Sequence, residues 1–327
     1  MGVEPLGGRA GDAVVTMRAD LAGLKRPHQG AAVAVGTFDG VHLGHRALLS
    51  ATLAEAHRRS LAPLALTWDR HPASTLRPQQ APPLLTSIAR KIELLSERDL
   101  DHVAVLAFDE DLASWPPERF ASDVLAEALG AKLVMVGQNW RFGRRAAGNV
   151  DTLARLGADL GFEAHAVQLE RPETGGEVVS STRIRAALQD GDVEGARLLL
   201  GRPFDFDGTV VHGDGRGALL GYPTANLEVD AALVRPQKGI YAGRAMVDGD
   251  VYPAALSIGV NPTFVADDAR PPIRIEAYLL DFSGDLYGRR LRIELHARLR
   301  DELSFDSTAA LVEQMARDVA ATRAVTR

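Results

Sequence analysis

The chain has 327 residues, a length typical of two domains, and its 46% hydrophobic and 24% charged residues exclude a mainly disordered protein. The formal net charge of −6 argues against a nucleic-acid binder, and the absence of cysteine excludes disulfides, thiolate metal sites and cysteine nucleophiles. Neither a secretory signal nor an apolar run long enough to cross a membrane is present in the sequence. We therefore expect a cytoplasmic protein with no nucleic-acid or membrane partner, and the sequence predicts no oligomeric state.

Short apolar runs alternate with amphipathic stretches through the first 190 residues. The runs predict strands, and the stretches predict helices because their apolar residues recur at helical spacing. The predicted strands are residues 31–35, 61–68, 103–108, 132–136 and 163–169, and the predicted helices are residues 43–59, 86–98, 116–129 and 150–160. Thr86 is expected to cap its helix. The alternation predicts an α/β domain with a parallel sheet covered on both faces.

After Gly201 the pattern changes to strands separated by Gly, Pro, Asn and Asp. The predicted strands are residues 210–211, 240–247, 251–258, 273–280 and 291–299, and one helix is predicted over residues 307–323 with Ser307 as its cap. Several strands without intervening helices predict an antiparallel barrel. We expect a first domain over residues 1–188, a linker helix over 189–200 and a second domain over 201–327.

A ten-residue segment joins the predicted strand of residues 31–35 to the predicted helix of residues 43–59. Its sequence is Gly36-Thr37-Phe38-Asp39-Gly40-Val41-His42-Leu43-Gly44-His45. Such a turn directs backbone N–H groups and the positive helix end at an anion, and its glycines let a ligand approach the backbone. His42 and His45 are three residues apart and can face one ligand. We expect them to bind a triphosphate and to stabilise charge as its α-phosphorus is attacked. A zinc pair is disfavoured because no third ligand lies nearby in the sequence.

Polar residues near the end of the first domain could complete this site. Ser181 and Thr182 can cap a helix and present hydroxyl groups. Arg183 and Arg185 are two apart and do not share a helix face, so only one of them is expected to reach the phosphates. Without the other motifs, the same pattern would describe a capped surface helix.

Asn139 and Trp140 follow a predicted strand, at the end where open α/β sheets bind ligands. An amide beside an aromatic ring suits a flavin ring or adenine. An ordinary strand end with a core aromatic is the alternative.

A second candidate site lies near the start of the second domain. The sequence has no Gly-x-x-x-x-Gly-Lys-Ser/Thr, which disfavours a P-loop kinase, but Gly213, Arg216 and Gly217 belong to a glycine-rich loop that could fold over phosphates. Thr224 and Asn226 point the same way if extended, and a hydroxyl and an amide oxygen suit Mg²⁺. An ordinary turn is the alternative.

Four segments of the first domain resemble, in order, the signature of the nucleotidylyltransferase superfamily. They resemble in particular the N-terminal module of the bacterial bifunctional riboflavin kinase/FMN adenylyltransferases, the FAD synthetases. The segments are the Gly36 to His45 turn, Thr67-Trp68-Asp69-Arg70-His71-Pro72, Val136-Gly137-Gln138-Asn139-Trp140-Arg141-Phe142-Gly143 and Val179-Ser180-Ser181-Thr182-Arg183-Ile184-Arg185. The resemblance implies a Rossmann-like domain that transfers the adenylyl group of ATP to FMN, and it selects Arg185 as the phosphate ligand.

The second domain resembles riboflavin kinases through Pro223-Thr224-Ala225-Asn226 and a series of later segments. These later segments are Gly239-Ile240-Tyr241, Gly259-Val260-Asn261-Pro262-Thr263-Phe264, Asp281-Phe282, Asp285-Leu286-Tyr287-Gly288 and Arg300-Asp301-Glu302. The resemblance implies a six-stranded antiparallel barrel with a C-terminal helix. It also implies Glu276 as the base that accepts a proton from riboflavin, and Arg300 as a flavin ligand.

Together the resemblances imply an enzyme that phosphorylates riboflavin to FMN and then adenylylates FMN to FAD, with ATP as co-substrate and Mg²⁺ as cofactor. The implied catalytic residues are His42, His45, Arg185 and Glu276, and the implied metal ligands are Thr224 and Asn226. The implied ATP and phosphate ligands are Gly36, Phe38, Asp39, Gly40, Gly44, Ser181, Thr182, Gly213, Arg216 and Gly217. The implied flavin ligands are Asn139, Trp140 and Arg300.

The chain departs from the family pattern at Trp68, Arg70, Trp140 and Ala218. The tryptophans replace phenylalanines, Arg70 replaces a proline, and Ala218 replaces a second arginine. We expect these changes to affect rates and affinities more than the type of reaction. The alternatives are a nucleotidylyltransferase with a different acceptor, a relative with a single activity, and a non-catalytic flavin-binding protein.

Overall fold

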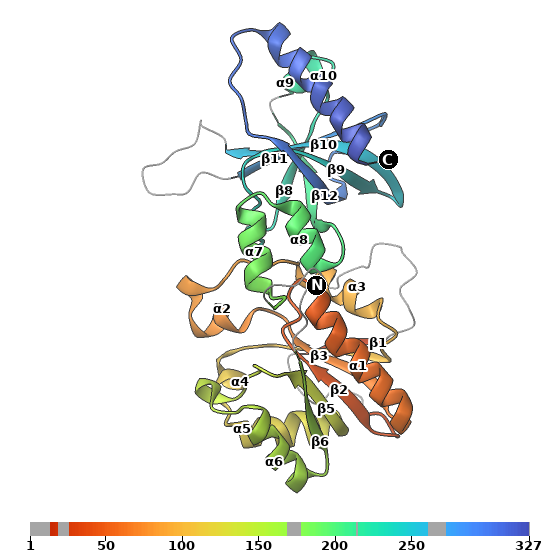
Figure 1. Cartoon of the computed structure of the whole chain (residues 1–327), viewed down its shortest axis with the longest axis vertical. Coiled ribbons are helices and arrows are strands. Elements are labelled where there is room, and N and C mark those ends of the chain that lie inside the picture. The colour runs from red at the N-terminus through yellow and green to blue at the C-terminus, as the bar shows by residue number, and fades with distance from the viewer. Residues whose placement is uncertain (1–13, 19–25, 169–177, 214, 261–272, 327) are drawn as a thin grey trace. The chain divides into compact units, whose positions relative to one another are not determined.

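The computed structural model describes residues 14–18, 26–168, 178–213, 215–260 and 273–326, and it divides into two compact units that meet in sequence at Ser181 and Thr182 (Figure 1). The side chains of Arg216 and Ala218 and the segment of residues 261–264 lie outside this description. The predicted boundary at residue 188 stays a prediction.

The first unit is a parallel sheet between two layers of helices. Its strands follow the order β1-β4-β3-β2-β5-β6, and every pair is parallel. The strands are β1 (Val14–Arg18), β2 (Ala31–Val35), β3 (Ala62–Trp68), β4 (His102–Leu106), β5 (Ala131–Gly137) and β6 (Glu163–Val167). The parallel α/β prediction is confirmed, and β1 adds an edge strand that the sequence pattern did not predict.

The helices of the first unit divide between the two faces of this sheet. Alternate residues of β2 belong to two separate cores, one formed with α1 and α3 and the other with the segment from α5 to α6. All five residues of β2 are therefore buried, which explains its unbroken apolar sequence. The helices are α1 (Leu43–Arg59), α2 (Pro72–Leu76), α3 (Ile88–Ser96), α4 (Glu110–Ser114), α5 (Pro117–Arg119), a π-helical segment (Phe120–Ala128) and α6 (Val150–Leu160), with short 3₁₀ turns at Pro78–Gln80 and Arg144–Ala146.

Thr86 does not cap α3, contrary to the prediction. Ser87 is the N-cap, since its Oγ accepts the backbone N–H of Arg90 at 3.2 Å. The hydroxyl of Thr86 instead accepts the backbone N–H of Gly40 at 3.2 Å, so it supports the turn after β2.

The second unit is a closed antiparallel barrel in the order β10-β11-β8-β7-β12-β9, preceded by two helices and followed by one. The barrel and its C-terminal helix confirm the prediction. The elements are α7 (Ser181–Gln189), α8 (Val193–Leu200), β7 (Phe204–Val211), α9 (Arg216–Leu219), β8 (Ala225–Val229), β9 (Gly239–Val247), β10 (Asp250–Val260), β11 (Ile273–Leu279), β12 (Arg290–Arg300) and α10 (Thr308–Val325). Ser307 caps α10 as predicted, whereas β7 is longer than expected and β8 was not predicted as a strand.

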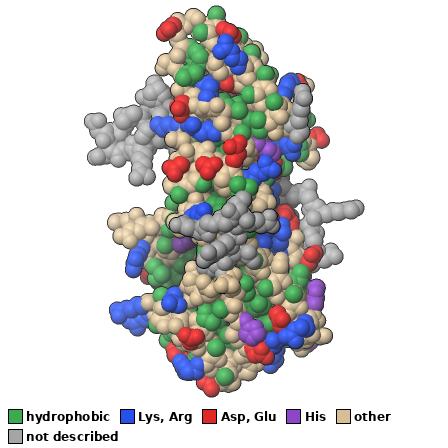
Figure 2. Space-filling model, in the orientation of Figure 1, with side chains coloured by type: hydrophobic (Ala, Val, Ile, Leu, Met, Phe, Trp, Pro, Cys, Tyr) green, Lys and Arg blue, Asp and Glu red, His purple; other side chains and the backbone are tan. Residues whose placement is uncertain are grey.

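None of the helices in the described ranges is long and apolar enough to cross a membrane. On the face shown in Figure 2, acidic and basic side chains are interspersed over the described surface.

Candidate active sites

The turn after β2 has an unusual backbone. Phe38 and Val41 have φ values of 49° and 40°, in the left-handed region that side chains with a Cβ rarely adopt. Their side chains are fully buried in the core between the sheet and α1. The apolar packing therefore holds the turn in a strained shape, which is a feature that often marks a functional site.

Hydrogen bonds from the segment before α3 and from Ser181 hold the same turn in place. The Asp39 carboxylate accepts the backbone N–H groups of Leu85 at 2.9 Å and of Thr86 at 3.2 Å. Ser181 Oγ donates to the backbone oxygen of Asp39 at 3.0 Å. The Asp39 carboxylate thus binds backbone N–H groups of the protein and stabilises the shape of the turn.

A buried lysine supports the turn from α3. Lys91 Nζ donates to the backbone oxygen of Trp68 at 2.7 Å and to that of Thr37 at 3.2 Å, and so joins the carboxyl ends of β2 and β3. Burial lowers the pKa of Lys91 to about 8, although the carboxylates of Asp39 and Asp69 act in the opposite direction. Lys91 belongs to none of the sequence motifs described above.

His42 and His45 meet at the start of α1. His42 is the N-cap, and its Nδ1 lies 3.4 Å from the backbone nitrogen of His45. The two rings are stacked, with centroids 3.6 Å apart and an angle of 17°. Burial, and then the nearby charges of His42 and Lys91, hold the pKa of His45 well below its ordinary value. His45 is therefore neutral near pH 7 and can donate an N–H without bringing a charge of its own.

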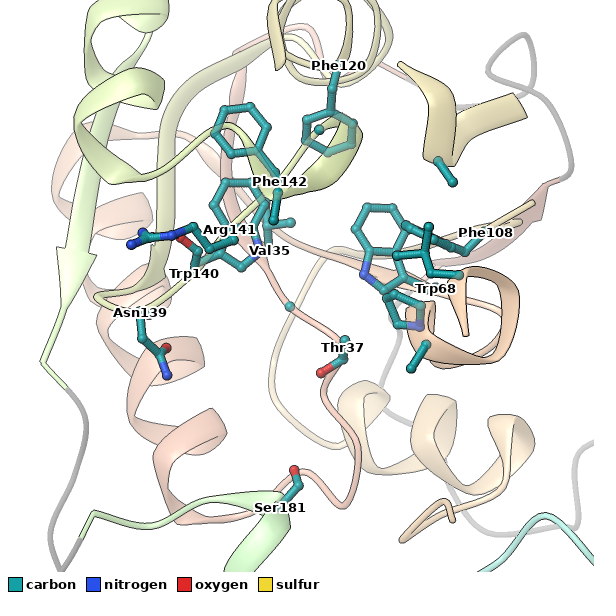
Figure 3. Close-up of a pocket in the computed structure, with 18 of the residues that line it drawn as sticks. Val35, Thr37, Trp68, Phe108, Phe120, Asn139, Trp140, Arg141, Phe142 and Ser181 are labelled. Atoms are coloured by element: carbon teal, nitrogen blue, oxygen red, sulfur yellow. The ribbon is translucent and has the colours of Figure 1, made fainter. Parts of the chain in front are cut away.

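Both histidines line a cavity of about 990 Å³ within the first unit. Aromatic side chains gather at one end of this cavity, and the hydroxyl groups of Thr37 and Ser181 lie toward the other (Figure 3). The aromatic residues are Trp68, Phe108, Phe120, Trp140 and Phe142. Trp140 and Phe142 are stacked at 4.6 Å with an angle of 11°. The cavity thus combines a surface for a flat ring with a polar end at the helix N-terminus.

The structure brings most of the predicted residues of the first domain to this cavity. The predicted residues that line it are Gly36, His42, Gly44, His45, Asn139, Trp140 and Ser181. Phe38 is fully buried in the core and supports the turn from behind. Thr182 and Arg185 lie on α7 beyond the division between the units, where Thr182 is exposed and Arg185 is buried.

The barrel places Thr224, Asn226 and Glu276 together. Asn226 on β8 and Glu276 on β11 are direct cross-strand partners, so their side chains share one face of the sheet. Thr224 directly precedes β8, and its Oγ1 donates to Glu276 Oε2 at 3.2 Å. The three predicted residues therefore form one cluster of oxygen donors, although no group of three His, Asp or Glu side chains in the described chain could hold a metal.

Arg274 also belongs to this cluster, and sequence reasoning missed it. Its Nε donates to Asn226 Oδ1 at 2.9 Å and lies 2.7 Å from Glu276 Oε1. Arg274 is two residues before Glu276 on β11, so both side chains lie on the same side of the strand.

Two glycines of the predicted phosphate loop lie close to the cluster. A Cβ added to Gly213 would be 2.0 Å from Asn226 Nδ2, and one added to Gly217 would be 2.4 Å from the backbone oxygen of Tyr222. Both positions therefore need glycine for close packing.

Arg300 binds α10 in this structure. Its Nε and Nη2 donate to the two oxygens of Asp318 at 3.0 and 2.6 Å. This bidentate pair ties the helix to the end of β12. A flavin contact from Arg300 stays a prediction.

Two family models each match one unit of the chain. A family model described as FAD synthetase matches residues 24–183, and one described as riboflavin kinase matches residues 200–326. A crystal structure from Streptococcus pneumoniae, described as a macrolide-efflux protein, is similar with a TM-score of 0.84 and 30% identity, over 94% of this chain and 98% of its own.

Relatives from two bacteria match nearly the whole chain. A bifunctional riboflavin kinase/FMN adenylyltransferase of Pseudomonas fluorescens is 37% identical over 92% of this chain and 95% of its own length. The protein of the same name from Escherichia coli K12 is 36% identical over 89% of this chain and 91% of its own. The order of the two units, the site in each and these likenesses agree: the chain belongs to the family of bifunctional riboflavin kinase/FMN adenylyltransferases.

Proposed function

We propose that the chain converts riboflavin to FAD in two ATP-dependent steps, the first in the barrel and the second in the cavity of the first unit. The observation that carries this proposal is the stacked histidine pair on the wall of an aromatic cavity, in one chain with the Thr224, Asn226 and Glu276 cluster. The substrates are riboflavin, FMN and ATP. We also keep the expectation of a cytoplasmic protein without nucleic-acid or membrane partners.

In the barrel, the terminal hydroxyl oxygen of riboflavin attacks the γ-phosphorus of ATP. An oxygen–phosphorus bond forms to give FMN, the bond between the γ-phosphorus and the bridging oxygen breaks, and ADP leaves. Glu276 accepts the hydroxyl proton, since a carboxylate within hydrogen-bond reach can act as general base. The hydrogen bond from Thr224 supports this role, because it orients the carboxylate.

Thr224 and Asn226 are the proposed ligands of Mg²⁺. A hydroxyl, an amide oxygen and a nearby carboxylate are hard oxygen donors, and their convergence fits a cation that takes a few protein ligands together with nucleotide phosphates. When bound, Mg²⁺ neutralises negative charge that develops on the phosphates.

In the first unit, a phosphate oxygen of FMN attacks the α-phosphorus of a second ATP. The new phosphorus–oxygen bond gives FAD, and the bond to the β-phosphate breaks to release pyrophosphate. The FMN phosphate is ionised at neutral pH, so the step needs alignment and charge stabilisation rather than a strong base. His42 and His45 donate hydrogen bonds to the phosphates beside the N-terminus of α1, and Asn139 and Trp140 hold the flavin ring.

Two hydroxyl groups and an arginine complete the proposed phosphate site. Ser181 begins α7 and also contacts the turn through Asp39. Arg185 follows Ser181 by four residues and therefore lies on the same face of α7. Thr182 and Arg185 belong to the second unit, so their part in binding the phosphates stays a prediction from the family resemblance.

The test is to incubate the purified chain with riboflavin, ATP and Mg²⁺ and to separate the flavins by chromatography. We expect FMN to appear first and FAD to follow. FMN alone, or FAD only from added FMN, would identify a relative with one activity. Bound flavin with no ATP consumed would identify a non-catalytic binding protein, and the proposal would be wrong.

A further inference from the structure

The contacts of Arg274 place a positive charge directly on the proposed kinase site. Its Nε lies 2.9 Å from Asn226 Oδ1 and 2.7 Å from Glu276 Oε1. One oxygen belongs to a proposed metal ligand, and the other belongs to the proposed base. The side chains of Arg274 and Glu276 are 28% and 29% exposed, so a ligand entering the site can reach both.

The fold determines this arrangement. The antiparallel register sets Glu276 opposite Asn226, and Arg274 lies one side-chain position earlier on the same face of β11. The guanidinium of Arg274 brings a positive charge to Asn226 Oδ1 and Glu276 Oε1. A metal ion that takes Asn226 Oδ1 as a ligand must therefore displace Arg274 or lie next to its charge.

We propose that Arg274 is a built-in cation that occupies Asn226, one of the two proposed metal ligands of the barrel, while nucleotide is absent. This inference rests on the proposed kinase function of the same site. A divalent ion alone has to displace the guanidinium from Asn226 Oδ1, and it supplies no anion that could pair with the displaced guanidinium. A nucleotide supplies phosphate oxygens, which can pair with the released guanidinium. Arg274 thus makes divalent-ion binding in the barrel depend on nucleotide.

The experiment measures Mn²⁺ binding to the full chain without nucleotide, by electron paramagnetic resonance of free Mn²⁺. We expect Arg274→Met to bind Mn²⁺ at least about tenfold more tightly than the wild type. The double variant Arg274→Met/Asn226→Ala should lose this gain. The control is Arg292→Met, which removes an arginine that pairs with Asp207 at 2.9 Å on another part of the barrel and should leave Mn²⁺ affinity unchanged.

A second measurement leaves Arg274 in place and so does not depend on the folding of the Arg274→Met variant. Wild type and Asn226→Ala are titrated with Mn²⁺, with and without a non-hydrolysable ATP analogue. We expect the difference between them to appear only with the analogue. Tight Mn²⁺ binding that needs Asn226 but no nucleotide would overturn the inference, as would unchanged affinity in a folded Arg274→Met variant.

The flavin assay separates failure of this inference from failure of the proposed function. If the wild type makes FMN and Asn226→Ala does not, the proposed kinase site is supported. The Mn²⁺ titrations then test only the role of Arg274. If the wild type makes no FMN from riboflavin and MgATP, the proposed function is wrong, and the inference that rests on it is wrong as well.

Discussion

Two stacked imidazoles at one helix start are the most informative residues of the first unit. Their spacing in the sequence predicted that they would face one ligand, and both line the same cavity. The low pKa of His45 comes from burial, which the sequence does not reveal. The same turn also shows a limit of motif reading, because Phe38 and Asp39 belong to the motif but point into the protein.

His45→Ala should lower the rate of FAD formation by about 100-fold or more, because one positioned donor to the reacting phosphate is lost. FMN should still accumulate from riboflavin, and both products are measured by chromatography. His57→Ala is the matched control, since His57 is exposed on the last turn of the same helix. Loss of both FMN and FAD in His45→Ala would contradict separate sites.

Asn226→Ala should stop FMN formation from riboflavin but spare the conversion of added FMN to FAD. The substitution removes the amide oxygen of a proposed metal ligand and leaves the first unit unchanged. The two conversions are assayed separately on the same preparation, so the second serves as the control. Unchanged FMN output would show that the metal assignment is wrong.

At the scale of elements, the boundaries of several helices were predictable and two strands were missed. The boundaries predicted for α1 and α6 agree with the structure, and the buried residues of α6 recur at helical spacing. β1 and β8 have five residues each, as the predicted strands β2, β4 and β6 do, so length does not explain why they were missed; β1 pairs with β4, and β8 pairs with β7 and β11. Contacts across such pairs, including those of Arg274, need the register and could not be read from the sequence.

Lys91 is a case where the helical pattern held a signal. It lies on α3 three residues after Ile88 and four before Leu95, so it shares the apolar face of the helix. A charged residue on that face needs buried partners. The pattern could not identify those partners, which are backbone oxygens at the ends of two strands.

The stability of the first unit should rise with pH relative to that of a Lys91→Met variant. The folded-state pKa of Lys91 is about 8 and its ordinary value is 10.5, so between these values the unfolded chain holds a proton that the folded chain has lost. The free energy of unfolding of the wild type should therefore gain about 2 kcal/mol over that of the variant between about pH 7 and 9.5.

The measurement for Lys91 is urea unfolding followed by tryptophan fluorescence. All three tryptophans lie in the first unit, so the signal reports that unit. Lys132→Met is the control, because Lys132 is an exposed lysine of the same unit and should show no such gain. An equal pH dependence in wild type and Lys91→Met would contradict the lowered pKa.

At the scale of the whole molecule, the tryptophans and the tyrosines belong to different units, so each kind of residue reports the unfolding of one unit. The three tryptophans belong to the first unit and the five tyrosines to the second. Asp318→Asn should destabilise the barrel by about 3 kcal/mol, because it weakens a buried bidentate pair with Arg300. Tyrosine absorbance should report this shift, while the unfolding midpoint from tryptophan fluorescence stays unchanged.

Asp281→Asn is the matched control for the barrel. It breaks the pair of Asp281 with Arg323 on the same C-terminal helix, but both side chains are largely exposed, so the cost should stay below about 1 kcal/mol. A shift of the tryptophan midpoint in Asp318→Asn would show that the two units do not unfold independently.

The closure of the barrel has a consequence for self-association. A closed sheet offers no row of open backbone groups to which another chain can add a strand. The sheet of the first unit ends instead at β1 and β6. On β6, Glu163 is paired with Arg59, and charge on an edge strand hinders such addition. Any aggregation of the folded chain through strand addition would therefore begin in the unit that carries the paired histidines, and loss of the Glu163 charge would promote it.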